Sequence, residues 1–420
     1  MTKLNRWVKL ALTGVLILSG LLVGLGIVEI GLRIAGIEYK TFYTVDEHRG
    51  WVLRPLVSGW YRSEGESYVQ INSDGFRDRE HTLVKPENTL RIALLGDSFV
   101  EALQVPLEKG FAAVIERTLS DCPAKAVQKV EVINFGVSGY GTAQELITLR
   151  EKVWDYSPDI VLLAFFTGND LTDNSRTIFE KKGLDKKVLD KVHLFKPYFE
   201  LKDDRLVLDE SYVNTDTYRS ALSWWNQAYI KIEDRSRILQ VLHHGQSVFE
   251  RLLNQSLKSV AKLPIEEQDL KFIFDRDIYK PPTDPDRQQA WQVTEKIISL
   301  MHNEVIAKKA DFAVVTLSDN APAHPDPSVR QEYMQALGVA DLFYPEKRIK
   351  DLGEREGFSV LNLGPTFQAY AEQNHVCLHG FDNAVPCGGH WNALGHQLAG
   401  KMIASKLCEK FPSIATNQVQ

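Results

Sequence analysis

The chain has little cysteine and no excess of basic residues, and each shortage excludes a class of function. Its 420 residues include 49 Lys and Arg against 55 Asp and Glu, which gives a formal net charge of −6. A nucleic-acid-binding protein would carry a basic face, so no nucleic acid partner is expected. The sequence also lacks internal repeats and low-complexity segments, and its 44% hydrophobic and 25% charged residues are ordinary for a globular protein.

The cysteines are Cys122, Cys377, Cys387 and Cys408. They form no CxxC pair of the kind that holds zinc or performs redox chemistry, and they suit an oxidising compartment. We hypothesise one disulfide between Cys377 and Cys387, which would close a short loop just before His390, and a second between Cys122 and Cys408. Four free thiols are the alternative.

One long apolar run lies near the N-terminus. Lys3, Arg6 and Lys9 precede the uncharged stretch Leu10–Val28, and Glu29 follows it. The stretch is about as long as a helix needs to cross ~30 Å of hydrocarbon. Because the basic residues come first, we expect the N-terminus in the cytoplasm and a single-pass membrane protein whose body is periplasmic or otherwise extracytoplasmic. A cleaved signal peptide is the alternative, and it leaves the compartment of the body unchanged.

The body alternates apolar strands with helical stretches. The expected strands are Arg91–Leu95, Val130–Gly136, Ile160–Phe166, Asp311–Leu317 and Phe358–Leu363. Strands that are apolar almost throughout indicate a parallel sheet covered on both faces. The fold class is therefore expected to be α/β: a doubly wound, flavodoxin-like three-layer sandwich with about five parallel strands, an N-terminal transmembrane helix and a mainly helical insertion. In such sheets, sites lie at the carboxyl ends of the strands.

The domain boundaries follow from the same alternation. Residues 1–36 would form the cytoplasmic tip and the anchor, residues 37–90 a lead-in, and residues 91–170 with 289–420 the core. Residues 171–288 are polar and charged and do not fit the pattern, so they are expected to form a helical or irregular insertion that caps the site. Within the insertion, Ser220–Leu257 is the best helical candidate. After the insertion, apolar residues recur at helical spacing over Gln289–Lys309, which predicts another helix there.

Four short segments carry candidate chemistry, and each follows a predicted strand or comes just before the last helix. They are Gly96-Asp97-Ser98, Asn134–Gly139, Thr167–Asp170 and Gly389–His396. Ser98 would begin a helix, where free N–H groups favour developing negative charge. Taken alone, each segment has a structural interpretation: a helix cap, a Gly-rich loop, a turn and a hydrogen-bonded histidine.

Together the four segments resemble the blocks of the SGNH/GDSL hydrolase superfamily, in the right order and on the right elements. The family letters fall on Ser98, Gly139, Asn169 and His390, and the resemblance covers about residues 90–170 and 310–410. INSDGFRD (Ile71–Asp78) ahead of the nucleophile strand also resembles a membrane-anchored bacterial subgroup. The resemblance implies acyl transfer through an acyl-Ser98, with His390 as base and an oxyanion hole made by Ser98, Gly139 and Asn169. It implies no metal and no organic cofactor.

The sequence departs from the family at the third member of the triad. Family members place an aspartate two or three residues before the histidine, and here those positions hold Gly388 and Cys387. Three interpretations are open: a dyad oriented by a backbone carbonyl, an acid such as Asp382 from the same loop, or a catalytically weak protein. His396 is a rival base that the family pattern places inside the last helix.

These observations predict an extracytoplasmic serine ester hydrolase or acyltransferase that acts on O-acyl groups, above all O-acetyl groups of envelope or exported polysaccharide. One alternative is a lipid-directed esterase, lysophospholipase or thioesterase. Another is an SGNH-shaped binding or assembly module. Trp224, Trp225 and Tyr229 in the insertion would either stack on sugar rings or pack a helix into the core.

Overall fold

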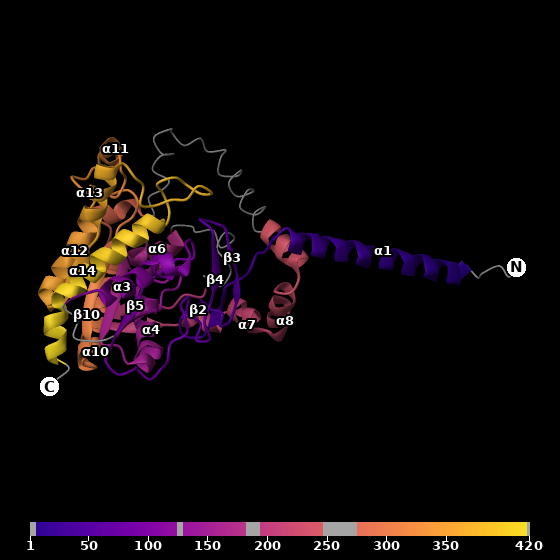
Figure 1. Cartoon of the computed structure of the whole chain (residues 1–420), viewed down its shortest axis with the longest axis horizontal. Coiled ribbons are helices and arrows are strands. Elements are labelled where there is room, and N and C mark those ends of the chain that lie inside the picture. Colours follow the sequence, from indigo (N-terminus) through magenta and orange to yellow (C-terminus); the bar gives the residue numbers. More distant parts are fainter. Residues whose placement is uncertain (1–5, 124–128, 182–193, 247–274, 418–420) are drawn as a thin grey trace. The chain divides into compact units, whose positions relative to one another are not determined.

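A computed structural model describes residues 6–123, 129–181, 194–246 and 275–417 (Figure 1). The chain divides into two compact units. One unit combines Met1–Thr41 with Arg219–Val260, and the other combines Phe42–Tyr218 with Ala261–Gln420. The second unit contains all the described strands and the four candidate segments, whereas the first contains the N-terminal helix α1 (Arg6–Ile34).

A five-stranded parallel sheet forms the centre of the second unit. Its strands are β5 (Thr89–Leu95), β6 (Lys129–Asn134), β7 (Ile160–Phe166), β10 (Asp311–Leu317) and β11 (Ser359–Asn362). Their spatial order is β6-β5-β7-β10-β11, and every neighbouring pair is parallel. Numbered along the chain, this is the flavodoxin-like order 2-1-3-4-5. The predicted fold class is confirmed.

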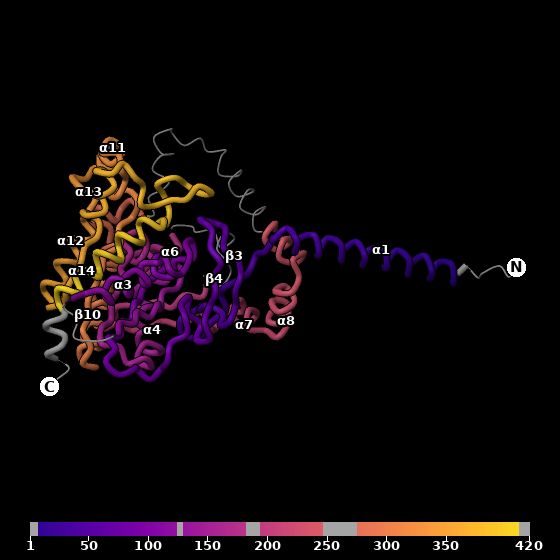
Figure 2. The backbone as a smooth tube through the Cα atoms, in the orientation of Figure 1, coloured from indigo at the N-terminus to yellow at the C-terminus, as the bar shows by residue number. Residues whose placement is uncertain are grey.

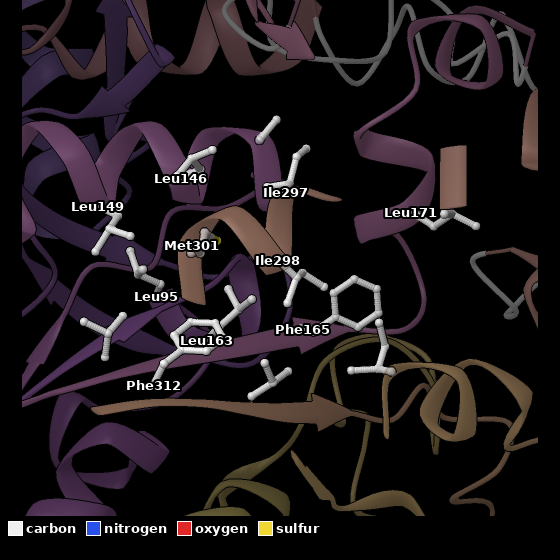
Figure 3. Close-up of a cluster of buried hydrophobic side chains, with 14 of the residues drawn as sticks. Leu95, Leu146, Leu149, Leu163, Phe165, Leu171, Ile297, Ile298, Met301 and Phe312 are labelled. Carbon is white, nitrogen blue, oxygen red and sulfur yellow. The ribbon is translucent and has the colours of Figure 1, made fainter. Parts of the chain in front are cut away.

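Helices cover both faces of the sheet because its strands are apolar on both sides. Ala93 and Leu95 of β5 pack with one cluster, whereas Ile92 and Leu94 pack with the other, as the two-residue period of a strand requires. The first cluster, part of which Figure 3 shows, includes α4 (Thr142–Glu151), α10 (Pro285–Ala307) and α12 (Tyr344–Glu356). The second includes α3 (Phe111–Ser120), α13 (Gly364–Asn374) and α14 (Ala393–Asn417). The sandwich therefore has three layers.

The cysteines connect segments that are distant in the sequence. Cys122 follows α3 and is bonded to Cys408 of α14, with a Cα–Cα distance of 6.0 Å across 286 residues of chain. α3 and α14 lie side by side (Figure 2), so this disulfide joins two packed helices. Cys377 is bonded to Cys387 with a Cα–Cα distance of 4.9 Å, and this disulfide closes the loop before His390.

Short elements surround the sheet. Among the described residues, three antiparallel hairpins lie outside it: β1 (Tyr43–Asp46) with β2 (Gly50–Leu53), β3 (Ser58–Tyr61) with β4 (Ser67–Gln70), and β8 (Tyr198–Lys202) with β9 (Arg205–Asp209). Further helices in the described part of the chain include α2 (Ser98–Glu101), α5 (Asp170–Asp173), α6 (Arg176–Lys181), α7 (Asp216–Leu222), α8 (Trp224–Glu233) and α11 (Pro327–Leu337). Short 3₁₀ turns lie at Leu107–Lys109, Val153–Tyr156, Ser211–Asn214 and Arg276–Tyr279.

The lead-in and the insertion are more ordered than the sequence predicts. The lead-in forms β1–β4, and the insertion contributes the β8–β9 hairpin, whose Phe199 packs into the same cluster as α10. The expected helix at Ser220–Leu257 appears as α7, α8 and a helical stretch at residues 237–246, and its last part lies outside the described residues. The described residues 219–246 group with the N-terminal helix, and the other described residues of the insertion group with the sandwich.

The two disulfides predict different consequences of removal. Replacing Cys122 and Cys408 by Ala should destabilise the full chain by about 2–4 kcal/mol, because this link closes the much longer loop in the unfolded chain. Replacing Cys377 and Cys387 should cost less stability and instead reduce the reactivity of Ser98, because that loop leads directly into His390. Denaturant unfolding in detergent, beside labelling of Ser98 by a fluorophosphonate, measures both effects. Equal losses of stability from the two double variants would contradict the loop-length argument.

Candidate active site

Ser98 stands at the carboxyl end of β5, beside the point where the strand order reverses. It follows the strand after Gly96 and Asp97 and begins the four-residue helix α2. Both neighbours of β5 end at the same edge of the sheet: β6 leads into the loop of Gly139, and β7 leads into Asn169. The topology therefore gathers three of the four predicted segments at one edge.

His390 brings the fourth segment to Ser98. The Ser98 hydroxyl lies 2.8 Å from His390 Nε2. The next residue, Trp391, is fully buried in the cluster that also holds α3 and α13. Asn392 then caps α14, because its Oδ1 accepts the N–H groups of Leu394 and Gly395 at 3.0 and 3.1 Å. A buried anchor and a helix cap thus fix the backbone on the C-terminal side of His390.

Glu64 occupies the other side of the imidazole. This residue lies in the turn between β3 and β4, inside the predicted lead-in. Its Oε2 is 2.5 Å from His390 Nδ1, and its Oε1 accepts the backbone N–H of His390 at 2.7 Å. Burial raises the pKa of Glu64, but the hydrogen bonds and charge of His390 outweigh burial, so the pKa of Glu64 is lowered. The ionised Glu64 accepts the Nδ1 proton, which leaves Nε2 to accept the Ser98 hydroxyl proton.

The loop before His390 is shaped to receive Glu64. A Cβ atom on Gly389 would lie 2.2 Å from Glu64 Oε1, so the carboxylate needs a glycine there. Asn383 connects the same loop to the β3–β4 turn: its Oδ1 accepts the Gly65 N–H at 2.8 Å and its Nδ2 donates to the Gly65 carbonyl at 2.9 Å. The turn that carries Glu64 and the loop that carries His390 are therefore held together directly.

The two other sequence candidates do not contact the Ser98–His390 pair. Asp382 is exposed, and Glu64 rather than Asp382 takes the Nδ1 position. His396 lies in the first turn of α14, stacked on Phe111 with ring centroids 5.9 Å apart. Burial lowers the pKa of His396 to about 3, so it stays neutral as part of the core. The position expected for Asp382 is thus filled from the opposite end of the chain.

No local signal in the sequence identifies Glu64. Glu66, two residues later, has the same composition around it, yet its carboxylate is exposed and bonds Arg62 at 2.9 Å. The one available clue is indirect: glycine and cysteine stand where the family places its acid, so the acid must come from elsewhere. Only the packing of the β3–β4 turn on the loop before His390 distinguishes Glu64 from Glu66.

The loop that contains Gly139 is oriented by two buried side chains. The indole N–H of Trp51 donates to the Ser138 carbonyl at 3.0 Å. Because carbonyl and N–H groups lie on opposite sides of a trans peptide, this bond turns the Gly139 N–H away from Trp51. Lys196 Nζ donates to the Gly139 carbonyl at 2.8 Å and pairs with Asp173 at 2.9 Å. Trp51 and Lys196 are therefore positioning residues for this loop.

The same loop is packed closely on the nucleophile helix. A Cβ on Gly136 would lie 2.5 Å from Val100 Cβ and 2.6 Å from the Glu101 nitrogen, so only glycine allows this approach. Asn134 donates to the Val100 carbonyl at 2.8 Å, and its Oδ1 accepts the Gly136 N–H at 2.9 Å. The buried Glu101 accepts the Ser138 N–H at 3.1 Å. α2 and the loop after β6 thus form one rigid assembly.

Arg77, from the segment Ile71–Asp78, supports the other end of α2. Its guanidinium is buried and donates to the carbonyls of Glu101, Ala102 and Val105. Burial lowers the pKa of Arg77 to about 10, with nearby Glu101 opposing the shift, so the group stays charged at neutral pH. Upstream in this segment, Asn72 Oδ1 accepts the N–H groups of Asp74 and Phe76 at 3.1 and 2.8 Å, which makes a tight turn.

Several buried carboxyl groups lie near the nucleophile. Burial raises the pKa of Asp97 to about 6, although its hydrogen bond from the Phe99 N–H and a polar contact with Asn169 oppose the change. Burial, reinforced by neighbouring carboxylates, raises the pKa of Glu145 and Asp170 well above the usual range. Burial and the neighbouring carboxylates thus favour the protonated, neutral forms of Glu145 and Asp170.

The arrangement can activate a serine. Ser98 Oγ, His390 and Glu64 form a continuous line of hydrogen bonds, in which His390 can take the hydroxyl proton and Glu64 can stabilise the resulting imidazolium. The Ser98 N–H begins α2 and so has no partner within that helix. The loop of Gly139 and the side chain of Asn169 follow the two adjacent strands.

Comparison with known proteins finds solved structures that are similar to this chain at low sequence identity. No family model matches the chain, and no curated protein matches it. The chain is similar to an acetyl xylan esterase (12% identity, 76% of this chain and 100% of that chain, TM-score 0.38). It is also similar to a lipase/acylhydrolase from Enterococcus faecalis (12% identity, 76% of this chain and 96% of that chain, TM-score 0.34). A third similar structure is a GDSL-like lipase from Bacteroides thetaiotaomicron (11% identity, 76% of this chain and 88% of that chain, TM-score 0.31). Similarity at this level carries no information about substrate.

The geometry predicts that Glu64 controls the reactivity of Ser98. Glu64→Gln should slow labelling of Ser98 by a fluorophosphonate by about 10³–10⁴, because loss of the carboxylate disturbs both the tautomer and the charged form of His390. Glu66→Gln, in the same turn, and Asp382→Asn should label at the wild-type rate. The measurement is the labelling rate of the full chain in detergent. Slow labelling of Asp382→Asn with normal labelling of Glu64→Gln would reverse the assignment.

The raised pKa of Asp97 predicts a pH-dependent cost to stability. Between about pH 4 and pH 6 the unfolded chain ionises this carboxyl while the folded chain keeps its proton, so stability falls as pH rises through this range. Asp97→Asn cannot ionise, and its side-chain oxygen can still cap α2. Its stability relative to wild type should therefore improve from pH 4 to pH 7 by up to about 3 kcal/mol. Denaturant unfolding at several pH values tests this, with the exposed Asp382→Asn as control; parallel pH curves for wild type and Asp97→Asn would contradict it.

Proposed function

We propose that the protein is an SGNH/GDSL-type serine esterase or acyltransferase that forms an acyl-Ser98 intermediate. The observation that carries the proposal is the unbroken line Ser98 Oγ–His390–Glu64, with 2.8 Å and 2.5 Å separations. The carboxylate that the sequence lacks in its usual place is supplied by Glu64. The alternative of a binding or assembly module without catalysis was based on the missing acid. Because Glu64 lies in the position of that acid, the reason for this alternative no longer applies.

The reaction takes place in two halves. Ser98 Oγ attacks the ester carbonyl while His390 Nε2 takes its proton, and Glu64 stabilises the imidazolium. The tetrahedral intermediate collapses, the bond to the leaving alcohol breaks, and His390 returns the proton to that alcohol. Water or an acceptor hydroxyl then attacks the acyl-Ser98 with the same proton transfers in reverse. This releases a free acid in a hydrolase or a new ester in a transferase.

The Ser98 and Gly139 N–H groups and the Asn169 amide are the proposed oxyanion donors. One such donor typically lowers the barrier by about 3 kcal/mol. The orientation that Trp51 gives to the Gly139 peptide supports its part in this role.

The proposed location is the outer side of a membrane. α1 contains the stretch Trp7–Ile34, which is long and apolar enough to span a bilayer. The basic residues before it favour a cytoplasmic N-terminus and an extracytoplasmic body. The pairing of all four cysteines is compatible with an oxidising compartment. An anchored, outward-facing esterase suits O-acetyl groups of envelope or exported polysaccharide as substrate.

The test is acetate release from acetylated polysaccharides by the full chain, beside p-nitrophenyl acetate and a long-chain ester. Wild type should release acetate, and Ser98→Ala and His390→Ala should each lose about four orders of magnitude or more in kcat. Glu66→Gln is the control and should match wild type. Turnover of long-chain esters alone would favour the lipid-directed alternative, and equal rates for all variants would overturn the acyl-Ser98 proposal.

A further inference from the structure

Helix α8 exposes a set of large side chains that nothing in the proposed reaction uses. Trp224 is 64% exposed, Trp225 68%, Tyr229 45% and Ile232 57%. Trp225, Tyr229 and Ile232 recur at helical spacing, so they share one face of α8. Packing into the core, one of the two sequence interpretations of Trp224, Trp225 and Tyr229, is therefore wrong. Large aromatic side chains that gather on an exposed face indicate an interaction surface.

The chain that follows α8 is tied to the C-terminal end of α1 within the same compact unit. The Glu29 carboxylate of α1 accepts the backbone N–H groups of Arg237 at 3.0 Å and Ile238 at 3.1 Å. Arg33, one turn further along α1, is bonded to Glu29 at 2.9 Å. Lys40 donates to the carbonyl of Asp234, the C-cap residue of α8, at 2.8 Å. These contacts fix the end of α8 beside the end of α1.

The position of Glu29 relates α8 to a bilayer. Glu29 is the first charged residue after the apolar run Leu10–Val28, which covers about the ~30 Å of a hydrocarbon core, so Glu29 lies at the hydrocarbon boundary of an inserted α1. α8 has 10 residues, and its C-terminal end at Asp234 lies next to that boundary. In Figure 1, α8 runs across the direction of α1 rather than along it. If α1 spans a bilayer, a helix that runs across it at this level would lie along the membrane surface.

We propose that α8 is an interfacial helix whose exposed aromatic face inserts among the lipid headgroups. Trp and Tyr are enriched at this level because their rings are apolar while their N–H and O–H groups remain hydrated. An amphipathic helix with aromatic residues on its outer face binds in the same way. The lipid surface is favoured over a glycan because the contacts of Glu29 and Lys40 hold α8 at the boundary of the membrane-spanning helix. The inference rests on the membrane anchoring part of the proposed function and not on the esterase part.

Tryptophan quenching in vesicles tests the proposal on the full chain. The protein is reconstituted in phosphatidylcholine vesicles with acyl chains that carry bromine near the headgroup, and in unbrominated vesicles. The emission of a Trp224→Phe/Trp225→Phe variant is subtracted from the emission of wild type, and the difference is the fluorescence of the two tryptophans of α8. Phenylalanine is chosen because it keeps this face of the helix apolar. This difference emission should lose most of its intensity in brominated vesicles and resist quenching by aqueous acrylamide. Trp7→Phe reports insertion of α1, and Trp60→Phe removes an exposed ring of the other compact unit.

Three results would overturn the proposal. Difference emission that acrylamide quenches and bromine does not would put α8 in water, and a further change on adding an acetylated glycan would favour sugar binding instead. Emission protected from both quenchers would mean that protein, such as a second copy of the chain, covers the face. Trp7 emission that bromine also fails to quench would show that α1 is not inserted, so the anchoring itself would fail while the esterase assays remain unaffected.

Discussion

The proposed chemistry depends on the paired hydrogen bonds between Glu64 and His390. One carboxylate oxygen holds the His390 backbone N–H at 2.7 Å, and the other holds Nδ1 at 2.5 Å. The first bond fixes the main chain and the second fixes the ring, so the direction of Nε2 toward Ser98 is determined twice. Without Glu64, the imidazole would retain neither its tautomer nor a partner for its charged form. Several residues around this pair hold the turn near residue 64 against the loop near residue 390.

That contact explains features that otherwise look unrelated. The disulfide Cys377–Cys387 shortens the loop, Asn383 bonds both polar groups of Gly65, and Gly389 leaves space for the carboxylate. In the family pattern, the acid and the base share one loop, so their spacing is local. Here the acid comes from a hairpin more than three hundred residues earlier, and long-range packing has to supply the precision. The lead-in is therefore a structural part of the proposed site and not a spacer between anchor and body.

Sequence reasoning succeeded where the chemistry follows from local order. β5, β6 and β7 are apolar runs, and their ends carry Ser98, Gly139 and Asn169, so a parallel sheet brings these segments to one edge without knowledge of any side-chain contact. It failed where tertiary contacts decide. Glu64 and Glu66 differ only in which side of a hairpin turn faces the His390 loop, and Trp51 and Lys196 read as ordinary core or surface residues. The exposed face of α8 was also ambiguous, because helical spacing alone does not say what covers it.

The positioning residues around Ser98 come mostly from outside the α/β core, and this has a consequence for how the site is built. Trp51 orients the Gly139 peptide, Arg77 holds the end of α2, and Glu64 orients His390. All three lie between α1 and β5, in the segment that connects the membrane helix to the sheet. The sandwich alone supplies the nucleophile, the base and the loops, but it does not supply the carboxylate or the bond that directs the Gly139 N–H. A protein shortened to begin at β5 would keep the strands that define the fold and lose the contacts that align the proposed reacting groups.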